Sequence, residues 1–268
     1  MSNLSSTLLK SLARSRKVAI VSGSSSGIGA AIARELSLRG ASVVINYPSQ
    51  TERIAAEAVF ESLKGNSKSI LVEADLSTIA GPSKLVEAAV AEFGKIDILV
   101  NNAGIVMPNR IDDEDDESVL NIWDRVVALN GRGTLLLTRA VLKHLAPSNS
   151  RIINISSSTS RNPDPNISIY AGTKGMIDSF TRCWARDLPR RYGCTVNTVA
   201  PGPVATESMQ AALPHALEAI MKVCEETPVA PRMAEPFEVA WTVAMLCEDN
   251  AGWLNGLYVP VTGGSILS

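Results

Sequence analysis

Three side chains that can handle a proton lie close together in this chain: Ser157, Tyr170 and Lys174. Tyr170 and Lys174 are four residues apart, so on a helix both side chains project from the same face. An ammonium beside a phenol favours the phenolate, which would bring a tyrosine with an ordinary pKa of ~10 into use nearer neutral pH. A hydroxyl at Ser157 could hold the oxygen atom that gains or loses the proton. The three residues predict a general acid–base site, although the same Tyr–Lys spacing also occurs on ordinary surface helices.

A buried strand and a helix would position these side chains. Residues 152–155 are a β-branched apolar run that predicts a buried strand, and serines follow it up to Ser158. Residues 175–184 have apolar side chains at helical spacing, and we expect Tyr170 and Lys174 in the first turns of that helix. Because open α/β sheets bind ligands at the carboxyl ends of their strands, Ser157 is expected at the ligand-binding edge.

A glycine-rich turn lies between a predicted first strand, residues 17–22, and a predicted helix, residues 30–39. Its glycines would let the backbone approach a pyrophosphate, whose charge the N-terminus of the helix favours. A serine-rich loop is the alternative, but the order strand, glycine turn, helix favours dinucleotide binding. The residues expected to contact the dinucleotide here are Gly23, Ser25, Ser26, Gly27, Ile28 and Gly29.

The second predicted strand, residues 41–47, bears on the choice of cofactor. In proteins that bind NAD, a carboxylate about 20 residues after the glycines binds the ribose 2′-hydroxyl. Here Asn46 and Tyr47 end the strand, and the first acid is Glu52. With no carboxylate at the strand end, nothing would repel a 2′-phosphate, so we expect NADP(H), although no Arg or Lys stands in the obvious positions. The groups that could bind the phosphate are the side chains of Ser24, Asn46, Tyr47 and Ser49.

Helices and strands alternate through the rest of the chain, which predicts an α/β fold. A long helix expected over residues 119–144 contains Asn130, Gly131 and Gly133. Two glycines inside a helix cost roughly 1 kcal/mol each relative to alanine, so we expect a local bend or close packing at Asn130. Residues 207–232 contain helix formers interrupted by three prolines and could form a mobile lid over a substrate. The other elements are expected as helices over residues 52–63, 82–93 and 236–247 and strands over residues 69–74, 96–100, 194–199 and 257–261.

The composition of the chain argues against several classes of protein. Its 268 residues carry a formal net charge of −2, which gives no reason to expect nucleic acid or an anionic membrane as a partner. No apolar run approaches the ~18 residues that a membrane span needs. Four widely spaced cysteines are expected to be buried free thiols in a reducing compartment, so we expect a cytoplasmic protein.

Two further segments have a distinctive composition. Residues 1–16 are rich in serine and leucine and contain no acid, which is typical of transit peptides and equally compatible with a frayed N-terminal arm. Six consecutive acids at residues 112–117 are expected to form a solvated loop before the next helix, and we assign them no metal.

Taken in order, the motifs over about residues 17–264 resemble those of the short-chain dehydrogenase/reductase family. The glycine turn resembles the cofactor turn of that family, and residues 101–104 resemble its sheet motif. Residues 201–206 resemble the segment that holds the nicotinamide carboxamide. A second strand ending in Asn-Tyr is similar to that of fungal hydroxynaphthalene reductases, which prefer NADPH. The residues that match the catalytic tetrad of the family are Asn130, Ser157, Tyr170 and Lys174.

The resemblance implies a fold and a reaction. The fold would be a Rossmann-type α/β domain over residues 17–268, with a doubly wound parallel sheet of seven strands and helices on both faces. Hydride would pass between a nicotinamide and a carbonyl carbon, with Tyr170 donating the proton to the oxygen and Ser157 polarising that oxygen. Lys174 would lower the pKa of the phenol and bind the nicotinamide ribose, and Asn130 would anchor a water.

The resemblance also implies an assembly and a set of cofactor contacts. A homotetramer would form through helices at residues 119–144 and 168–191 and through the C-terminal segment 252–268. A small molecule would be the substrate. Beyond the glycine turn, the residues expected to contact NADP(H) are Asn46, Tyr47, Asp75, Leu76, Asn102, Ala103, Gly104, Tyr170, Lys174, Pro201, Gly202, Val204 and Thr206.

The loop between Ser157 and Tyr170 is a departure, because two prolines stiffen it and place Asp164 close to the tetrad in sequence. A turn aspartate is the simpler interpretation. An aspartate beside the nicotinamide could instead stabilise an iminium and could be ordered by Arg132. Some fungal members of the family in indole-alkaloid pathways are similar here, act on imines, and in some cases guide a cycloaddition.

Three functions are therefore open. The first is an NADP(H)-dependent ketone reductase or secondary-alcohol dehydrogenase of fungal secondary metabolism. The second is an imine reductase or cyclase on the same scaffold, distinguished by Asp164. The third is a cofactor-binding scaffold without catalysis, against which the intact tetrad argues.

Overall fold

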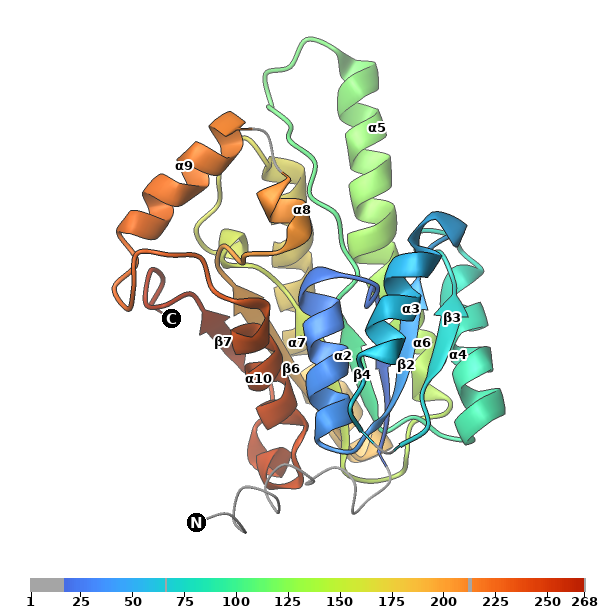
Figure 1. Ribbon diagram of the computed structural model, residues 1–268. Coiled ribbons are helices and arrows are strands. Elements are labelled where there is room, and N and C mark those ends of the chain that lie inside the picture. The colour runs from blue at the N-terminus through green and yellow to red at the C-terminus, as the bar shows by residue number, and fades with distance from the viewer. Residues whose placement is uncertain (1–16, 66, 212–213, 268) are drawn as a thin grey trace.

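The computed structural model of the chain describes residues 17–65, 67–211 and 214–267, so the expected extension 1–16 lies outside the described residues. Seven parallel strands form one sheet in the order β3-β2-β1-β4-β5-β6-β7 (Figure 1). This confirms the doubly wound α/β fold. The strands are β1 (Val18–Val21), β2 (Ser42–Tyr47), β3 (Ile70–Glu73), β4 (Ile98–Asn101), β5 (Ser150–Ile155), β6 (Cys194–Pro201) and β7 (Tyr258–Val261).

Helices cover both faces of this sheet, and each face has its own hydrophobic layer. In β2, Val43 and Ile45 pack in one layer and Val44 in the other, because successive side chains of a strand point to opposite faces. The first layer is completed by α2 (Gly27–Leu38), α3 (Arg53–Glu61) and α10 (Pro236–Cys247), and the second by α4 (Gly81–Phe93), α6 (Thr134–Leu142) and α7 (Ser168–Tyr192).

The strand order reverses between β1 and β4, which lie side by side at the centre. From β1 the chain winds outward to β2 and β3, and from β4 it winds the other way to β7. The connections leave the carboxyl ends of β1 and β4 in opposite directions, and open α/β sheets bind ligands in the crevice that this creates. The carboxyl end of β5, which precedes Ser157, is next to that of β4.

The expected helix over residues 119–144 is interrupted in its middle by a π-helical turn. It consists of α5 (Asp116–Val126), the π-helical segment η2 (Val127–Gly133) and α6. The bend expected at Asn130 is therefore present as one wider turn. Of the six acids at residues 112–117, only the first ones form the expected loop. Asp115 caps α5 and accepts from the backbone N–H of Glu117 at 3.1 Å. The last two acids lie in the first turn of α5, where the helix dipole favours negative charge.

The helix that carries Tyr170 and Lys174 places both residues in its first turns, as expected. α7 starts at Ser168 and includes Gly172 and Gly175. A short 3₁₀ turn, η3 (Ser158–Ser160), leads from β5 toward it. Both catalytic candidates therefore lie on regular helix, which fixes the direction of their side chains.

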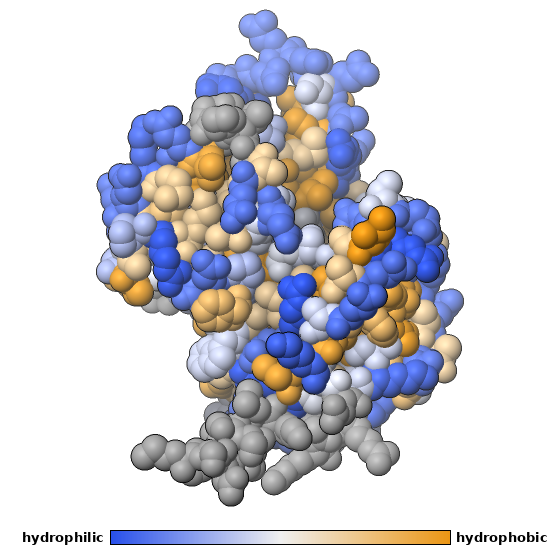
Figure 2. Space-filling model, viewed as in Figure 1, coloured by the Kyte–Doolittle hydropathy of each residue, from blue (hydrophilic) through white to orange (hydrophobic). Residues whose placement is uncertain are grey.

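The C-terminal part of the chain adds two helices beside the carboxyl ends of the strands. These are α8 (Glu207–Gln210) and α9 (Pro214–Glu225), so Pro214 begins a helix rather than interrupting one. Figure 2 shows the surface hollowed between this part and α5, with hydrophobic residues beside the hollow. Within the residues that the structure describes, no helix is long and apolar enough to span a membrane.

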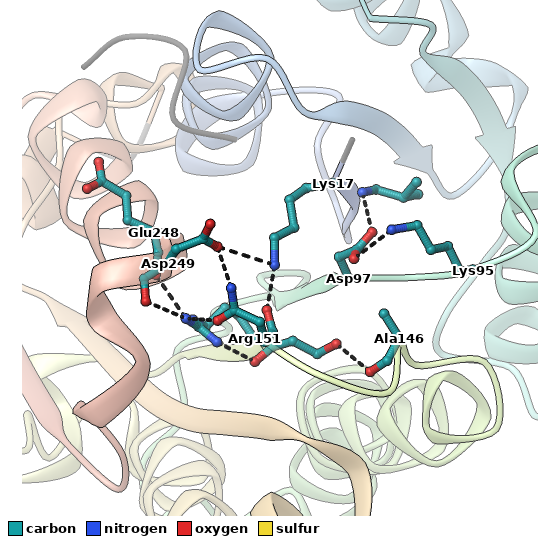
Figure 3. A network of polar contacts seen from close by, with 10 residues as sticks. Lys17, Lys95, Asp97, Ala146, Arg151, Glu248 and Asp249 are labelled. Carbon is teal, nitrogen blue, oxygen red and sulfur yellow. Dashed lines mark hydrogen bonds and ion pairs between the residues drawn. The ribbon is translucent and has the colours of Figure 1, made fainter. Parts of the chain in front are cut away.

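Buried charges join the amino ends of the central strands, at the edge opposite the expected site (Figure 3). Asp97 accepts from the Val18 N–H at 2.8 Å and pairs with Lys95 at 2.9 Å. Lys17 donates to the Asn149 carbonyl at 2.6 Å, and burial lowers its pKa. Arg151, the second residue of β5, donates to the Glu248 carbonyl at 2.9 Å. These contacts tie β1, β4 and β5 to the segment that follows α10, so we interpret them as structural.

Candidate active site

The glycine turn between β1 and α2 is shaped by close backbone approach. Gly23 and Gly27 have φ angles of +59° and +53°, a region that side chains with a Cβ rarely adopt. A Cβ at Gly29 would lie 2.2 Å from the Gly23 carbonyl oxygen, and a Cβ at Gly23 would lie 2.9 Å from the Ala103 Cα. The turn therefore requires these glycines for its own geometry.

The N-terminus of α2, which follows this turn, is open to an anion. Ser26 occupies the cap position but its side chain makes no capping bond, and the first turn of the helix contains no acid. No described residue accepts from the backbone N–H groups of Gly27, Ile28 or Gly29. Unpaired N–H groups and the positive end of a helix dipole suit a pyrophosphate, so this turn fits a dinucleotide.

Two further segments close around the turn. The side chain of Asn102 donates to the carbonyl oxygens of Ser22 at 2.9 Å and Gly23 at 3.1 Å. The methyl group of Thr206 lies against the turn, 3.2 Å from where a Cβ of Gly27 would stand. The structure thus brings residues 101–104 and 201–206 to the glycine turn from distant parts of the sequence. In the second segment Pro201 ends β6, the Gly202 N–H donates to the Val261 carbonyl at 3.0 Å, and Val204 is buried.

The side chain of Asn46, which was expected to bind a 2′-phosphate, is engaged elsewhere. It is buried, accepts from the Gly23 N–H at 3.0 Å and donates to the Ala74 carbonyl at 2.9 Å. Ser24 is fully buried and donates to the Val21 carbonyl at 2.7 Å. Both side chains therefore hold β1, β2 and the turn together, and neither is free to bind a 2′-phosphate. Tyr47, the last residue of β2, is also buried.

The expectation that no carboxylate would stand near the end of β2 also needs correction. Glu52 lies five residues beyond Tyr47, but the 3₁₀ turn η1 (Gln50–Glu52) brings it back to the glycine turn. Its carboxylate accepts from the Ser25 hydroxyl at 2.7 Å. A negative charge therefore stands on the turn after all.

Asn130 lies in the π-helical segment with its side chain fully engaged. It donates to the Ile105 carbonyl at 3.0 Å and to the Thr173 hydroxyl at 3.2 Å, and it accepts from the Ile105 N–H at 2.9 Å. A Cβ at Gly104 would lie 3.2 Å from the Asn130 amide oxygen and 3.6 Å from the Lys174 ammonium. The end of the sheet motif, Asn130 and Lys174 thus meet at one place.

Ser157, Tyr170 and Lys174 meet at the carboxyl end of β5. The Lys174 ammonium lies 5.5 Å from the centre of the Tyr170 ring and donates to the Ile155 carbonyl at 2.8 Å. Burial lowers the pKa of Lys174 to about 8, an effect that nearby Asp178 opposes. Burial raises the pKa of Tyr170, and a hydrogen bond with Ser157 partly offsets this.

This differs from the expected effect of the lysine on the phenol. Lys174 directs its proton to the Ile155 carbonyl, and burial dominates the pKa of Tyr170, which is raised rather than lowered. A tyrosine with an ordinary or a raised pKa is protonated at neutral pH, as a proton donor must be, but a raised pKa makes it the weaker acid.

The proposed pairing of Arg132 with Asp164 is wrong. Arg132 points to the other side of the π-helical segment and donates to the Ser77 carbonyl at 2.5 Å. Asp164 is exposed and accepts from the backbone and the side chain of Asn166 at 2.8 and 3.0 Å. It is thus an aspartate that closes its own turn, as the simpler interpretation held.

In the loop that Arg132 contacts, Asp75 accepts from the Ser77 N–H at 2.9 Å, and Leu76 is buried.

Asn109 is a site residue that the sequence analysis missed. It is buried and links residues 105–109 to the start of α7 through a bridge with Ile167. Its side chain contacts Ser168 and Ile169, the two residues before Tyr170. No sequence motif indicates this role, because the residues concerned are about sixty positions apart.

Possible metal ligands and thiols are the other reactive groups to consider. In the described part of the chain, no three His, Cys, Asp or Glu side chains are grouped so that they could hold a metal ion. All four cysteines are unpaired in the described structure. Cys194, Cys224 and Cys247 are buried as expected, but Cys183 is exposed.

Comparison with known proteins agrees with this geometry. A family model described as enoyl-(acyl carrier protein) reductase matches residues 23–265. The chain is similar to the short-chain dehydrogenase/reductase FrzI of a Cladobotryum species, with 41% identity over 93% of this chain and 96% of that protein. The chain belongs to the short-chain dehydrogenase/reductase family. It is also similar to elsinochrome reductase 1 of Elsinoe fawcettii, with 36% identity over 97% of this chain and 99% of that protein.

Solved structures of the family superpose on the whole fold. A blue fluorescent protein from a metagenomic library, solved in complex with NADPH, has a TM-score of 0.84 and 31% identity, covering 94% of this chain and 98% of that one. The angucycline C-6 ketoreductase LanV, solved with bound NADP, has a TM-score of 0.83 and 31% identity, covering 94% and 96%. The protein is thus an oxidoreductase of this family with fungal reductases among its relatives.

Proposed function

We propose that this protein is an NADP(H)-dependent reductase that transfers hydride between the nicotinamide and a ketone or secondary alcohol in fungal secondary metabolism. The observation that carries the proposal is the meeting of Ser157, Tyr170 and Lys174 at the carboxyl end of β5, beside Asn130 and Gly104. The open N-terminus of α2 lies at the switch point of the same sheet and suits the pyrophosphate.

Each residue of the tetrad has a separate task in this reaction. The cofactor supplies the hydride. Tyr170 donates its phenolic proton to the substrate oxygen. Ser157, within hydrogen-bonding reach of Tyr170, holds and polarises the same oxygen. Lys174 binds the nicotinamide ribose, and Asn130 holds the backbone around Ile105 against the start of α7.

NADP(H) is proposed over NAD(H) on the basis of relatives. The two solved structures named above hold NADPH and NADP. The residues of this chain do not by themselves indicate NADP(H), since Asn46 is engaged with the backbone and the Glu52 carboxylate contacts the glycine turn. The preference therefore needs a direct measurement.

The alternative functions have less support. The iminium role depended on Asp164 and Arg132, each of which contacts another group instead. A scaffold without catalysis would not need a Tyr–Lys pair beside a serine, with the lysine buried. We therefore retain the ketone as the substrate class. A ketone with aromatic rings suits the hydrophobic residues beside the hollow between α5 and α8–α9 (Figure 2).

We also propose the setting in which the enzyme works. Residues 207–232 act as the lid over the substrate, since α8 begins directly after Thr206 at the glycine turn. The protein assembles as a homotetramer and acts in the cytoplasm on a small molecule.

The test is hydride transfer itself. The purified protein is mixed with NADPH deuterated at the transferred position and with a panel of aromatic ketones, and the products are examined by mass spectrometry. We expect deuterium at the carbinol carbon of at least one product. A panel that yields no deuterated alcohol, while a panel of cyclic imines yields deuterated amines, would favour the imine alternative.

A further inference from the structure

Glu52 occupies a position that neither its sequence neighbours nor the family motif indicates. β2 ends at Tyr47, and the chain then turns back through the 3₁₀ turn η1 before α3 begins at Arg53. The carboxylate of Glu52 accepts a hydrogen bond from the Ser25 hydroxyl at 2.7 Å. Glu52 is therefore fixed against the glycine turn by a contact between residues 27 positions apart.

The adenosine ribose of a dinucleotide bound at the glycine turn would lie close to this position. A pyrophosphate at the N-terminus of α2 leaves the adenosine to extend toward the end of β2, the strand next to β1. The end of β2 touches the turn directly, because Asn46 accepts from the Gly23 N–H at 3.0 Å. A group on the 2′ carbon of that ribose would stand close to Ser25 and to the carboxylate that Ser25 holds.

No described cation neutralises this carboxylate. Arg53, the next residue, pairs with Glu57 at 2.8 Å, and Gln50 binds Glu73, a second acid at the end of β3. Among the residues that the structure describes, no Lys or Arg forms an ion pair with Glu52 within 4 Å. The charge facing the 2′ position is therefore negative.

We propose that Glu52 is the residue that sets the ratio of NADPH to NADH affinity in this enzyme. A 2′-phosphate carries about two negative charges and is repelled by a carboxylate in a partly buried site. A 2′-hydroxyl can instead donate a hydrogen bond to the same carboxylate. Glu52 thus weakens the binding of NADPH and leaves the binding of NADH intact. The inference rests on the dinucleotide site of the proposed function, but not on which dinucleotide that function uses.

The test compares nucleotide affinities of matched variants. Dissociation constants for NADPH and NADH are measured by fluorescence titration for the wild type, Glu52→Gln and Glu57→Gln. Glutamine keeps the size of the side chain and an oxygen that can accept from Ser25. Glu57→Gln removes the same charge one turn further along α3, where Glu57 is paired with Arg53.

We expect Glu52→Gln to tighten NADPH binding by about tenfold or more and to change NADH binding by less than about threefold. Glu57→Gln should leave the ratio of the two constants unchanged. Raising the salt concentration should narrow the difference between the wild type and Glu52→Gln, because the effect is one of charge. If the ratio of the NADPH and NADH dissociation constants of Glu52→Gln lies within about threefold of the wild-type ratio, the proposal is overturned.

The outcomes separate this inference from the proposed function. If the wild type prefers NADH and Glu52→Gln reverses the preference, the role of Glu52 is confirmed and the proposed use of NADPH is wrong. If the wild type prefers NADPH and the variant leaves the ratio unchanged, the role of Glu52 is wrong and the proposed cofactor stands. Failure of the folded wild-type protein to bind either nucleotide overturns both.

Discussion

Asn109 donates to the Ser168 hydroxyl at 2.8 Å and joins the segment after β4 to the first residue of the catalytic helix. Its side-chain oxygen also accepts from the Ile169 N–H at 3.1 Å, and its own N–H donates to the Asn166 carbonyl at 2.7 Å. The first N–H groups of a helix have no acceptor within the helix. Asn109 therefore caps α7 from another segment, directly before Tyr170.

Replacing Asn109 by leucine should disturb the position of Tyr170 more than it disturbs the fold. We expect a loss of about 1–2 kcal/mol of unfolding free energy, the usual cost of a lost cap, and a fall in kcat with little change in NADPH affinity. Thermal unfolding, turnover and amide hydrogen exchange over residues 166–172 measure the three effects. Asn162→Leu, at an exposed position in the loop between η3 and α7, is the control and should change none of them. Unchanged exchange over residues 166–172 in Asn109→Leu would show that Asn109 does not hold this turn.

Tyr170→Phe should abolish turnover and leave NADPH binding nearly intact. The variant lacks only the phenolic hydroxyl, and loss of a general acid typically costs ~10²–10⁴-fold in rate. Steady-state kinetics with any ketone that the wild type reduces, beside an NADPH titration, makes the comparison. Activity near the wild-type value would mean that another group donates the proton.

Binding of NADPH by the free protein should weaken as the pH rises through about 8. Burial lowers the pKa of Lys174 to about 8, so its ammonium is present below that pH and is lost above it. The ammonium is the donor proposed for the nicotinamide ribose, and its loss removes both a charge and a hydrogen bond. NADPH dissociation constants measured from about pH 7 to about pH 9 should therefore increase with pH. Lys174→Arg, which stays charged over this range, should give a flat profile, and the same slope in both proteins would contradict the assignment.

Asp164→Asn should change kcat/KM by less than about threefold, well under 1.4 kcal/mol. Asp164 is exposed and accepts from Asn166, and asparagine can close the same turn. A carboxylate that stabilised an iminium would cost more than ~2 kcal/mol when removed from a closed site. Kinetics of the variant with a thermal-shift control in NADPH decides between the two. A loss of the larger size would restore the imine alternative.

The protein should be a tetramer at micromolar concentration in sedimentation analysis. Two separate surfaces expose large apolar side chains: Leu120 and Trp123 on α5, and Trp253 in η4 (Asp249–Trp253), whose side chain is 98% exposed. Burying such groups is the usual driving force of association. Trp123→Glu and Trp253→Glu should each remove one interface and leave dimers. A wild-type monomer would refute the assembly.

The order of the elements and the closeness of Ser157, Tyr170 and Lys174 could be predicted from the sequence because their signals are local. The β-branched run over residues 152–155 and the spacing of Tyr170 and Lys174 depend only on the periods of a strand and a helix. The glycines of the first turn could also be predicted to matter from their place between a strand and a helix. Only Gly29 meets the backbone of its own turn, whereas Gly23 lies against Ala103 and Gly27 against Thr206, from distant segments. Two glycines beside Asn130 predicted a local bend, and the structure has a π-helical turn there.

The direction of individual side chains was decided by the tertiary structure. Arg132 and Asp164 are both close in sequence to tetrad residues, but packing turned Arg132 toward Ser77 and left Asp164 in its own turn. Asn46 stands at the expected strand end, yet the neighbouring strands and the turn engage its amide. No sequence motif marks Glu52 or Asn109. A long-range contact holds Glu52 on the glycine turn, and another holds Asn109 at the start of α7. A periodic pattern determines which face of an element is buried, whereas the partner that a polar side chain finds depends on which distant segment the fold brings beside it.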